Sequence, residues 1–117
     1  MEIKNVKALC ICDSGNVRSG CLSRLIKALG GEAVSIGAIC CSKNTIKLFS
    51  KWSNVVFDMS SNPEFIKSSI DETCLDELAA EKLIRIDIGP DRWWTSGSIY
   101  NVELIEICLG IIKEHIL

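Results

Sequence analysis

The chain has 117 residues, of which 48% are hydrophobic and 24% are charged, and its formal net charge is −2. This length and balance indicate a single globular domain over residues 1–117, because a disordered chain contains fewer apolar and more charged residues. The sequence has no run rich in Lys or Arg and no apolar stretch long enough for a membrane span, so nothing in it favours a nucleic-acid or a membrane partner.

Predicted strands and helices alternate along the chain. Short, mostly apolar runs bounded by polar residues predict buried strands, and apolar residues recurring about once a turn predict helices. Gly30 and Gly31 stop the first helix, and Asn62 followed by Pro63 is typical of a helix start. In chain order, we expect a strand at 6–12, a helix at 18–29, a strand at 33–38, a helix at 44–52, a strand at 54–59, a helix from 62, a helical turn or two within 74–81, a strand at 83–88 and a helix at 101–117.

This alternation predicts an α/β fold in which a four-stranded parallel sheet is covered by helices on both faces. Ligands of such sheets bind beyond the carboxyl ends of the strands. Cys12 ends the first predicted strand, and the loop at 89–97 follows the fourth. We therefore expect Cys12 and this loop to lie at the same edge of the sheet.

The segment between Cys12 and Arg18 has the composition of a phosphate-binding loop. Successive backbone N–H groups in a short loop can form an anion-binding nest, and the helix that follows adds its first N–H groups and the positive end of its dipole. Arg18 can place its planar fork on two phosphate oxygens. The residues expected to surround the phosphate are Asp13, Ser14, Gly15, Asn16, Val17, Arg18 and Ser19.

Cys12 is the expected nucleophile of this loop. A thiol beside a helix N-terminus and an arginine loses its proton more readily than an ordinary cysteine, and the thiolate can attack phosphorus. Ser19 has a hydroxyl placed to hydrogen-bond the sulfur. Asp13 opposes this interpretation, since a carboxylate inside the loop repels the ligand unless its side chain points away. The alternative is structural, with a buried Cys12 at a tight turn and an Arg18 that pairs with a surface carboxylate.

The loop at 12–19 resembles that of low-molecular-weight protein tyrosine phosphatases, in which Cys-x5-Arg-Ser follows the first strand. Residues 35–38 resemble the second strand of that family, and residues 48–59 and 88–94 resemble segments of its compact predicted tyrosine phosphatase branch. The resemblance implies a three-layer, flavodoxin-like fold. It also implies hydrolysis, without metal or cofactor, of a phosphorylated protein or a small phosphomonoester, with phosphotyrosine as the expected substrate. This chain has Val17 where the best-known members have a second cysteine.

The expected general acid lies in the loop after the fourth strand. One carboxyl group can protonate the leaving oxygen and then activate water. Asp91 matches the acidic loop of the family, although the order here is Pro90-Asp91 rather than Asp-Pro. Asp87 is the alternative acid, but its place in the alternating strand favours a structural role. Trp93 and Trp94 are expected to wall the pocket and to stack on a phenyl ring, with core packing as the plainer role for at least one of them.

The seven cysteines form no CxxC pair, and with the single, distant His115 they do not match a zinc site. The first residues do not resemble a secretion signal, so we expect a reducing, cytoplasmic location in which most thiols are small buried apolar groups. The sequence leaves open a redox role for four of them, which are Cys21, Cys40, Cys41 and Cys74.

Three other functions are compatible with a cysteine at the end of the first strand. An arsenate reductase of the same fold needs further cysteines that relay a disulfide, and only Cys74 stands in the right half of the chain. A phosphocarrier has a similar cysteine loop but no use for Arg18 or Asp91. A degenerate phosphatase that binds phosphate or phosphopeptide without turnover is the third, and Asp13 together with the Pro90-Asp91 order favours it.

Overall fold

The computed structural model describes residues 2–13, 17–39, 41–62, 64, 82–89, 93 and 101–117. The strands in these ranges are β1 (Lys7–Cys12), β2 (Glu32–Gly37), β3 (Val55–Asp58) and β4 (Leu83–Arg85). The α-helices are α1 (Arg18–Ala28), α2 (Lys43–Trp52) and α5 (Val102–His115), and a short 3-10 helix (Ile3–Asn5) precedes β1. The sequence predicted each of these elements except the 3-10 helix.

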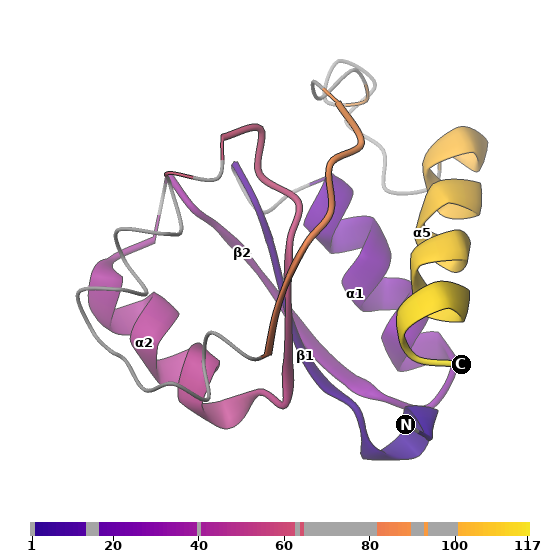
Figure 1. Cartoon of the computed structure of the whole chain (residues 1–117), viewed down its shortest axis with the longest axis horizontal. Helices are drawn as coiled ribbons and strands as arrows, with labels where there is room; N and C mark the ends of the chain where they lie inside the picture. Colours follow the sequence, from indigo (N-terminus) through magenta and orange to yellow (C-terminus); the bar gives the residue numbers. More distant parts are fainter. Residues whose placement is uncertain are drawn as a thin grey trace.

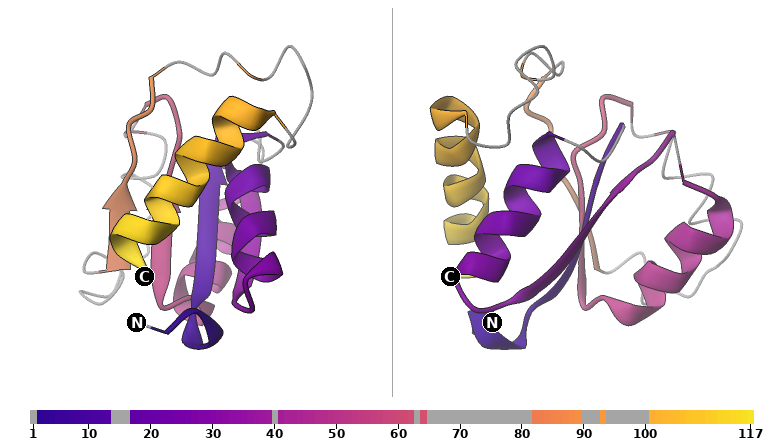
Figure 2. Two further views of the ribbon diagram at one scale, coloured as in Figure 1. Left: turned by 90° about the vertical axis from the view of Figure 1, so that its right-hand side faces the viewer. Right: turned by 180° about the vertical axis from the view of Figure 1, so that it is seen from behind.

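The four described strands form one parallel sheet in the order β2-β1-β3-β4. Helices α1 and α5 lie together on one face of this sheet, and α2 lies on the other (Figure 1, Figure 2). This arrangement confirms the predicted three-layer, flavodoxin-like α/β architecture. It also brings the carboxyl ends of these strands to one edge, at the top of Figure 1, and both α1 and α5 begin at that edge.

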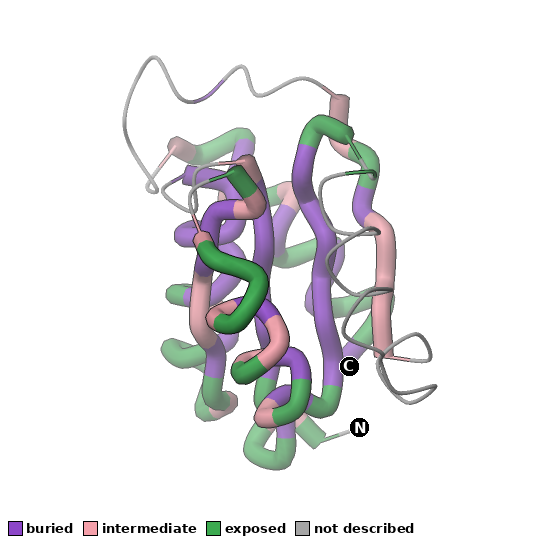
Figure 3. The backbone as a smooth tube through the Cα atoms, turned by 90° about the vertical axis from the view of Figure 1, so that its left-hand side faces the viewer, coloured by how far each residue is buried: buried purple, intermediate pink, exposed green. Residues whose placement is uncertain are grey.

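Strand β1 lies between β2 and β3 and is buried on both faces (Figure 3). Cys10 and Cys12 contribute to the apolar core under α1 and α5, whereas Leu9 and Ile11 contribute to the core under α2. Successive residues of a strand point to opposite faces, so a strand covered on both sides needs a continuous apolar run. This explains why the sequence leading to Cys12 does not alternate.

Helix α1 ends in a Schellman motif. The Gly30 N–H donates to the Lys27 carbonyl, and the Gly31 N–H donates to the Ile26 carbonyl. Gly30 has a φ of 105°, in the left-handed region that glycine adopts without strain. The predicted stop of this helix is therefore confirmed, and the chain turns directly into β2.

The predicted fourth strand, 83–88, is longer than β4, which ends at Arg85. Among the described strands β4 pairs only with β3, and β3 ends at Asp58. The last ladder bond runs from the Ile86 N–H to the Asp58 carbonyl, so the residues that follow have no described strand beside them. The helices predicted from 62 and within 74–81 lie almost entirely outside the described residues. No helix in the described ranges is long and apolar enough to cross a membrane.

Candidate functional site

The candidate site lies at the carboxyl edge of the sheet, where β1 is followed by α1. Cys12 is the last residue of β1 and is 1% exposed, and Arg18 and Ser19 open α1 and are fully buried. The structure thus brings together three of the residues that the sequence predicted for the phosphate loop. Three further loop residues lie outside the described ranges, namely Ser14, Gly15 and Asn16.

Ser19 supplies a hydrogen-bonding partner for the Cys12 sulfur. Sγ of Cys12 and Oγ of Ser19 lie 3.1 Å apart, and both side chains are buried. Either atom can donate while Cys12 is a thiol, but only the Ser19 hydroxyl can donate to a thiolate. The contact expected from the sequence is therefore present, and it gives an ionised sulfur a donor.

The Asp13 carboxylate forms an ion pair with the guanidinium of Arg18. Oδ2 of Asp13 lies 3.2 Å from Nη2 of Arg18, and the Arg18 side chain is 1% exposed whereas that of Asp13 is 26% exposed. The other carboxylate oxygen, Oδ1, accepts a hydrogen bond from the Ser61 N–H at 2.8 Å. Burial raises the pKa of Asp13, but the hydrogen bonds from Ser61 and the charge of Arg18 outweigh this effect and hold the pKa below its ordinary value. The carboxylate therefore lies on the arginine that was expected to clamp a phosphate.

The start of α1 differs from the starts of the other two described α-helices. In α2, the Ser42 side chain at the N-cap accepts a hydrogen bond from the Thr45 N–H, and in α5 Asn101 does the same for Leu104. The N-cap of α1 is Val17, whose side chain has no acceptor. A helix start whose cap residue contributes no oxygen suits an oxyanion ligand, which can accept from the first-turn N–H groups.

A second polar group lies where β3 ends. Asp58 is buried, and its Oδ1 accepts hydrogen bonds from the Ser60 hydroxyl at 2.6 Å and from the Ser60 N–H at 2.9 Å. Arg85 Nη1 lies 3.6 Å from the same oxygen and donates to the Asp58 carbonyl at 3.1 Å. These contacts fix the turn after β3, and the next residue of that turn, Ser61, is the one that binds Asp13.

The sequence predicted no role for Asp58, Ser60 or Ser61. A signal was present, because Asp58 is the last residue but one of the strand predicted at 54–59, and Ser60 and Ser61 follow that strand directly at the edge where ligands bind. Short polar side chains at that position commonly turn back onto the local backbone.

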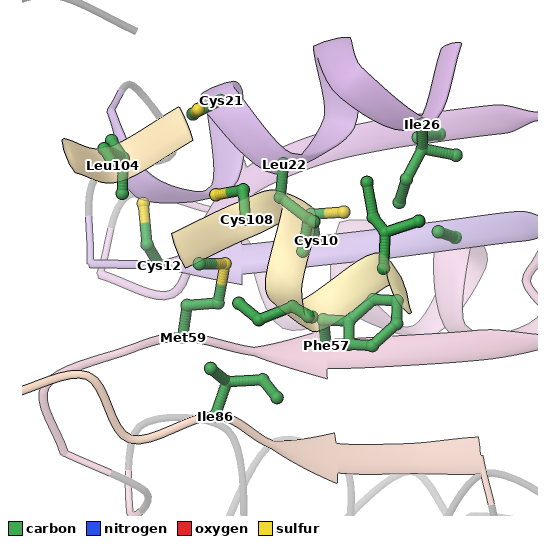
Figure 4. Packing of buried hydrophobic residues seen from close by; sticks show 14 of the residues in the cluster. Cys10, Cys12, Cys21, Leu22, Ile26, Phe57, Met59, Ile86, Leu104 and Cys108 are labelled. Carbon is green, nitrogen blue, oxygen red and sulfur yellow. The ribbon is translucent and has the colours of Figure 1, made fainter. Parts of the chain in front are cut away.

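The other described thiols near the site are core residues. Cys10, Cys21 and Cys108 are buried in the same apolar cluster as Cys12, between the sheet and helices α1 and α5 (Figure 4). Burial and the neighbouring Cys12 raise the pKa of the Cys10 thiol, and the hydrogen bond with Cys21 together with burial raises that of Cys108. Thiols that stay protonated are poor nucleophiles, so the raised pKa values of Cys10 and Cys108 favour packing over a disulfide relay for these two residues. The same hydrogen bond, from Cys108, lowers the pKa of Cys21 against the opposing effect of burial. Of the remaining cysteines, Cys41 packs against the core under α2, and Cys40 and Cys74 lie outside the described residues.

The residues predicted for the acid and for the pocket wall are placed only in part. Trp93 is 3% exposed and belongs to the apolar cluster under α1 and α5. A stacking wall needs an open ring face, so this placement favours core packing as the role of Trp93. Asp87 is exposed just beyond β4, and its carboxylate accepts a hydrogen bond from the Gly89 N–H at 3.0 Å, which closes a turn. Asp91 and Trp94 lie outside the described residues.

In the part of the chain that the structure describes, no group of three or more His, Cys, Asp or Glu side chains is arranged to hold a metal ion. No family model matches the chain, and comparisons with curated proteins and with solved structures give no match either.

Proposed function

We propose that the protein hydrolyses a phosphomonoester through a phosphocysteine intermediate on Cys12. The observation that carries this proposal is the 3.1 Å contact between the Cys12 sulfur and the Ser19 hydroxyl, at the point where β1 leads into α1. A thiolate needs a donor both before it attacks and after it leaves, and Ser19 meets that need. A buried hydroxyl on a sulfur at the ligand-binding edge of a parallel sheet is better suited to chemistry than to packing alone.

Arg18 and the start of α1 support the same proposal, because they are the groups that would hold the phosphate. A fully buried guanidinium keeps its positive charge and offers a planar fork to two oxygens. The N–H groups of the first turn of α1 point toward the same edge and add the positive end of the helix dipole. These donors would neutralise charge on the phosphoryl oxygens in the transition state.

The proposed reaction has two steps. In the first, the Cys12 thiolate attacks phosphorus, an S–P bond forms, the P–O bond to the leaving group breaks, and the leaving oxygen takes a proton from a carboxylic acid. In the second, the resulting carboxylate takes a proton from water, the water oxygen attacks phosphorus, and the S–P bond breaks to release orthophosphate and the thiolate. Asp91 is the proposed acid, and Asp87 is the alternative.

The substrate class within this proposal is a phosphomonoester, and phosphotyrosine is its most specific form. The support for an aromatic leaving group comes from the resemblance to low-molecular-weight protein tyrosine phosphatases and from Trp94. Trp93 contributes less than the sequence suggested, because its ring is buried in the core. An aryl phosphate is therefore the appropriate first probe.

Turnover of p-nitrophenyl phosphate in the presence of a chelator tests the proposal. Cys12→Ser should abolish release of nitrophenol while orthophosphate binding persists, because serine retains the shape of the loop but lacks a thiolate. Cys10→Ala is the matched control, since Cys10 is a buried thiol two residues earlier on the same face of β1. It should retain turnover. A Cys12→Ser protein that hydrolyses the ester at the wild-type rate would refute the proposed nucleophile.

A phosphate-binding module without turnover is the second candidate function. The observation that favours it is the Asp13 carboxylate on Arg18, which offsets part of the positive charge that would stabilise the transition state of hydrolysis. This candidate predicts orthophosphate binding that requires Arg18, with no nitrophenol released by wild type or by any variant. The turnover assay therefore separates the two candidates.

A further inference from the structure

The Asp13 carboxylate and an oxyanion ligand would need the same guanidinium. We propose that Asp13 is an intramolecular counter-anion of Arg18, that an oxyanion must displace it in order to bind, and that this competition sets the anion affinity of the loop. The inference rests on the proposed function in one respect, because it takes Arg18 as the anion-binding group. It does not require that the bound ester be hydrolysed.

The two partners of the ion pair are buried to different extents. Arg18 is almost completely covered and is charged at any ordinary pH, and a buried charge needs an opposite charge close by. The Asp13 side chain is 26% exposed, so it forms the solvent side of the pair. A ligand that arrives from solvent therefore meets Asp13 before it can reach this face of the guanidinium.

Asp13 is charged while it pairs with Arg18. Burial raises the pKa of Asp13, but the Ser61 hydrogen bonds and the Arg18 charge more than offset this, so the carboxylate is ionised at neutral pH. It leaves Arg18 by moving rather than by taking up a proton. Two anions on one buried guanidinium repel each other, so a bound phosphate and the Asp13–Arg18 pair exclude each other.

Asp13 is also hydrogen-bonded to the turn after β3. Asp13 Oδ1 accepts from the Ser61 N–H at 2.8 Å, and that turn is fixed in turn by the hydrogen bonds of Ser60 to Asp58. Displacement of Asp13 must therefore change the environment of the Ser61 N–H. The Ser61 amide is a reporter of displacement that a purely structural ion pair would leave unchanged.

The test is titration of the full chain with orthophosphate at fixed ionic strength. Calorimetry measures the affinity, and the NMR resonance of the Ser61 amide reports displacement of Asp13. Asp13→Asn keeps the shape of the side chain and removes its charge. If the pair is formed roughly nine-tenths of the time, only about a tenth of the protein is competent to bind, so this variant should bind phosphate about tenfold more tightly. Glu32→Gln makes the same change of net charge at the exposed amino end of β2, and its affinity should match that of wild type.

Wild-type protein should also show a phosphate-dependent shift of the Ser61 amide. Equal or weaker binding by Asp13→Asn overturns the inference, and so does a lack of phosphate binding by that variant. Tighter binding by Asp13→Asn also overturns the inference if phosphate causes no chemical-shift change of the Ser61 amide in wild type, because simple repulsion would then explain the difference in affinity. A third outcome separates the two proposals. If Asp13→Asn binds phosphate more tightly and the Ser61 amide resonance of wild type shifts, the inference stands. If, in addition, neither wild type nor any variant hydrolyses an aryl phosphate, the hydrolysis proposal fails.

Discussion

Ser19→Ala removes the hydroxyl that contacts the Cys12 sulfur and should slow the reaction most strongly in its second step. Ser19 is fully buried, and its Oγ lies 3.1 Å from Sγ. A hydrogen bond to a charged group contributes about 1.5–3 kcal/mol, and each 1.36 kcal/mol is about tenfold in rate. The expected loss is therefore roughly 10- to 150-fold. The thiolate is the leaving group when water attacks the phosphocysteine, so breakdown of the intermediate should become rate-limiting.

Rapid-mixing measurements with p-nitrophenyl phosphate check this expectation. The Ser19→Ala protein should release a burst of nitrophenol close to one equivalent of enzyme, followed by a slow steady state. Ser23→Ala is the matched control, because Ser23 is a buried serine one turn later on α1 whose hydroxyl donates to the Gly20 carbonyl at 3.1 Å. This control should stay within about twofold of wild type. Ser19→Ala with wild-type kinetics, or with the same loss as Ser23→Ala, would refute the role assigned to the hydroxyl.

Three further predictions concern stability. Gly31→Ala should lower the free energy of unfolding by about 1–3 kcal/mol, because its Cβ would lie 2.8 Å from Ile26 Cγ2 and 2.9 Å from the Ile3 carbonyl oxygen. Gly110 lies on α5 with open space where a Cβ would be, so Gly110→Ala should raise the free energy of unfolding by roughly 0.5–1 kcal/mol. Urea unfolding measures the change for both variants. The pKa of Asp13 is lowered in the folded protein, so its stabilising contribution is fully present above the unfolded value of about 3.9 and is lost as the pH falls through the folded value. Wild type should therefore lose more stability than Asp13→Asn between about pH 5 and pH 2. If the urea midpoints of the two proteins fall by the same amount over that range, the result counts against the ion pair.

The layered fold and the Cys12–Ser19 contact could be predicted because both depend on local sequence. A continuous apolar run predicts a strand buried on both faces, and helical spacing directly after a short loop predicts a helix at the same edge. Cys12 and Ser19 are seven residues apart, so the end of the strand and the start of the helix alone bring them together.

The partners of Asp13 and the role of Trp93 could not be predicted in the same way. Ser61 lies 48 residues after Asp13 in the chain, and only the order of the strands brings the two turns together. The pairing of two tryptophans in a polar segment indicated exposure of one and core packing of at least one, but not which, and tertiary packing placed Trp93 in the core. Local patterns carry no information about which side of a loop the rest of the chain will cover.

The orientation of Asp13 also bears on which residue can act as the acid. Cys12 lies in the same apolar cluster as Met59 and Leu104 (Figure 4). Asp13, the next residue in the chain, contacts Arg18 and the turn after β3 instead. Both oxygens of Asp13 are engaged. Its pKa is held low because Ser61 and Arg18 outweigh the effect of burial. A carboxylate that is ionised at neutral pH cannot give a proton to a leaving oxygen. Asp13 is therefore excluded as the proton donor of the proposed reaction, and the acid must come from another segment. The loop after β4 is the segment we propose, because β4 ends at the same edge of the sheet as β1.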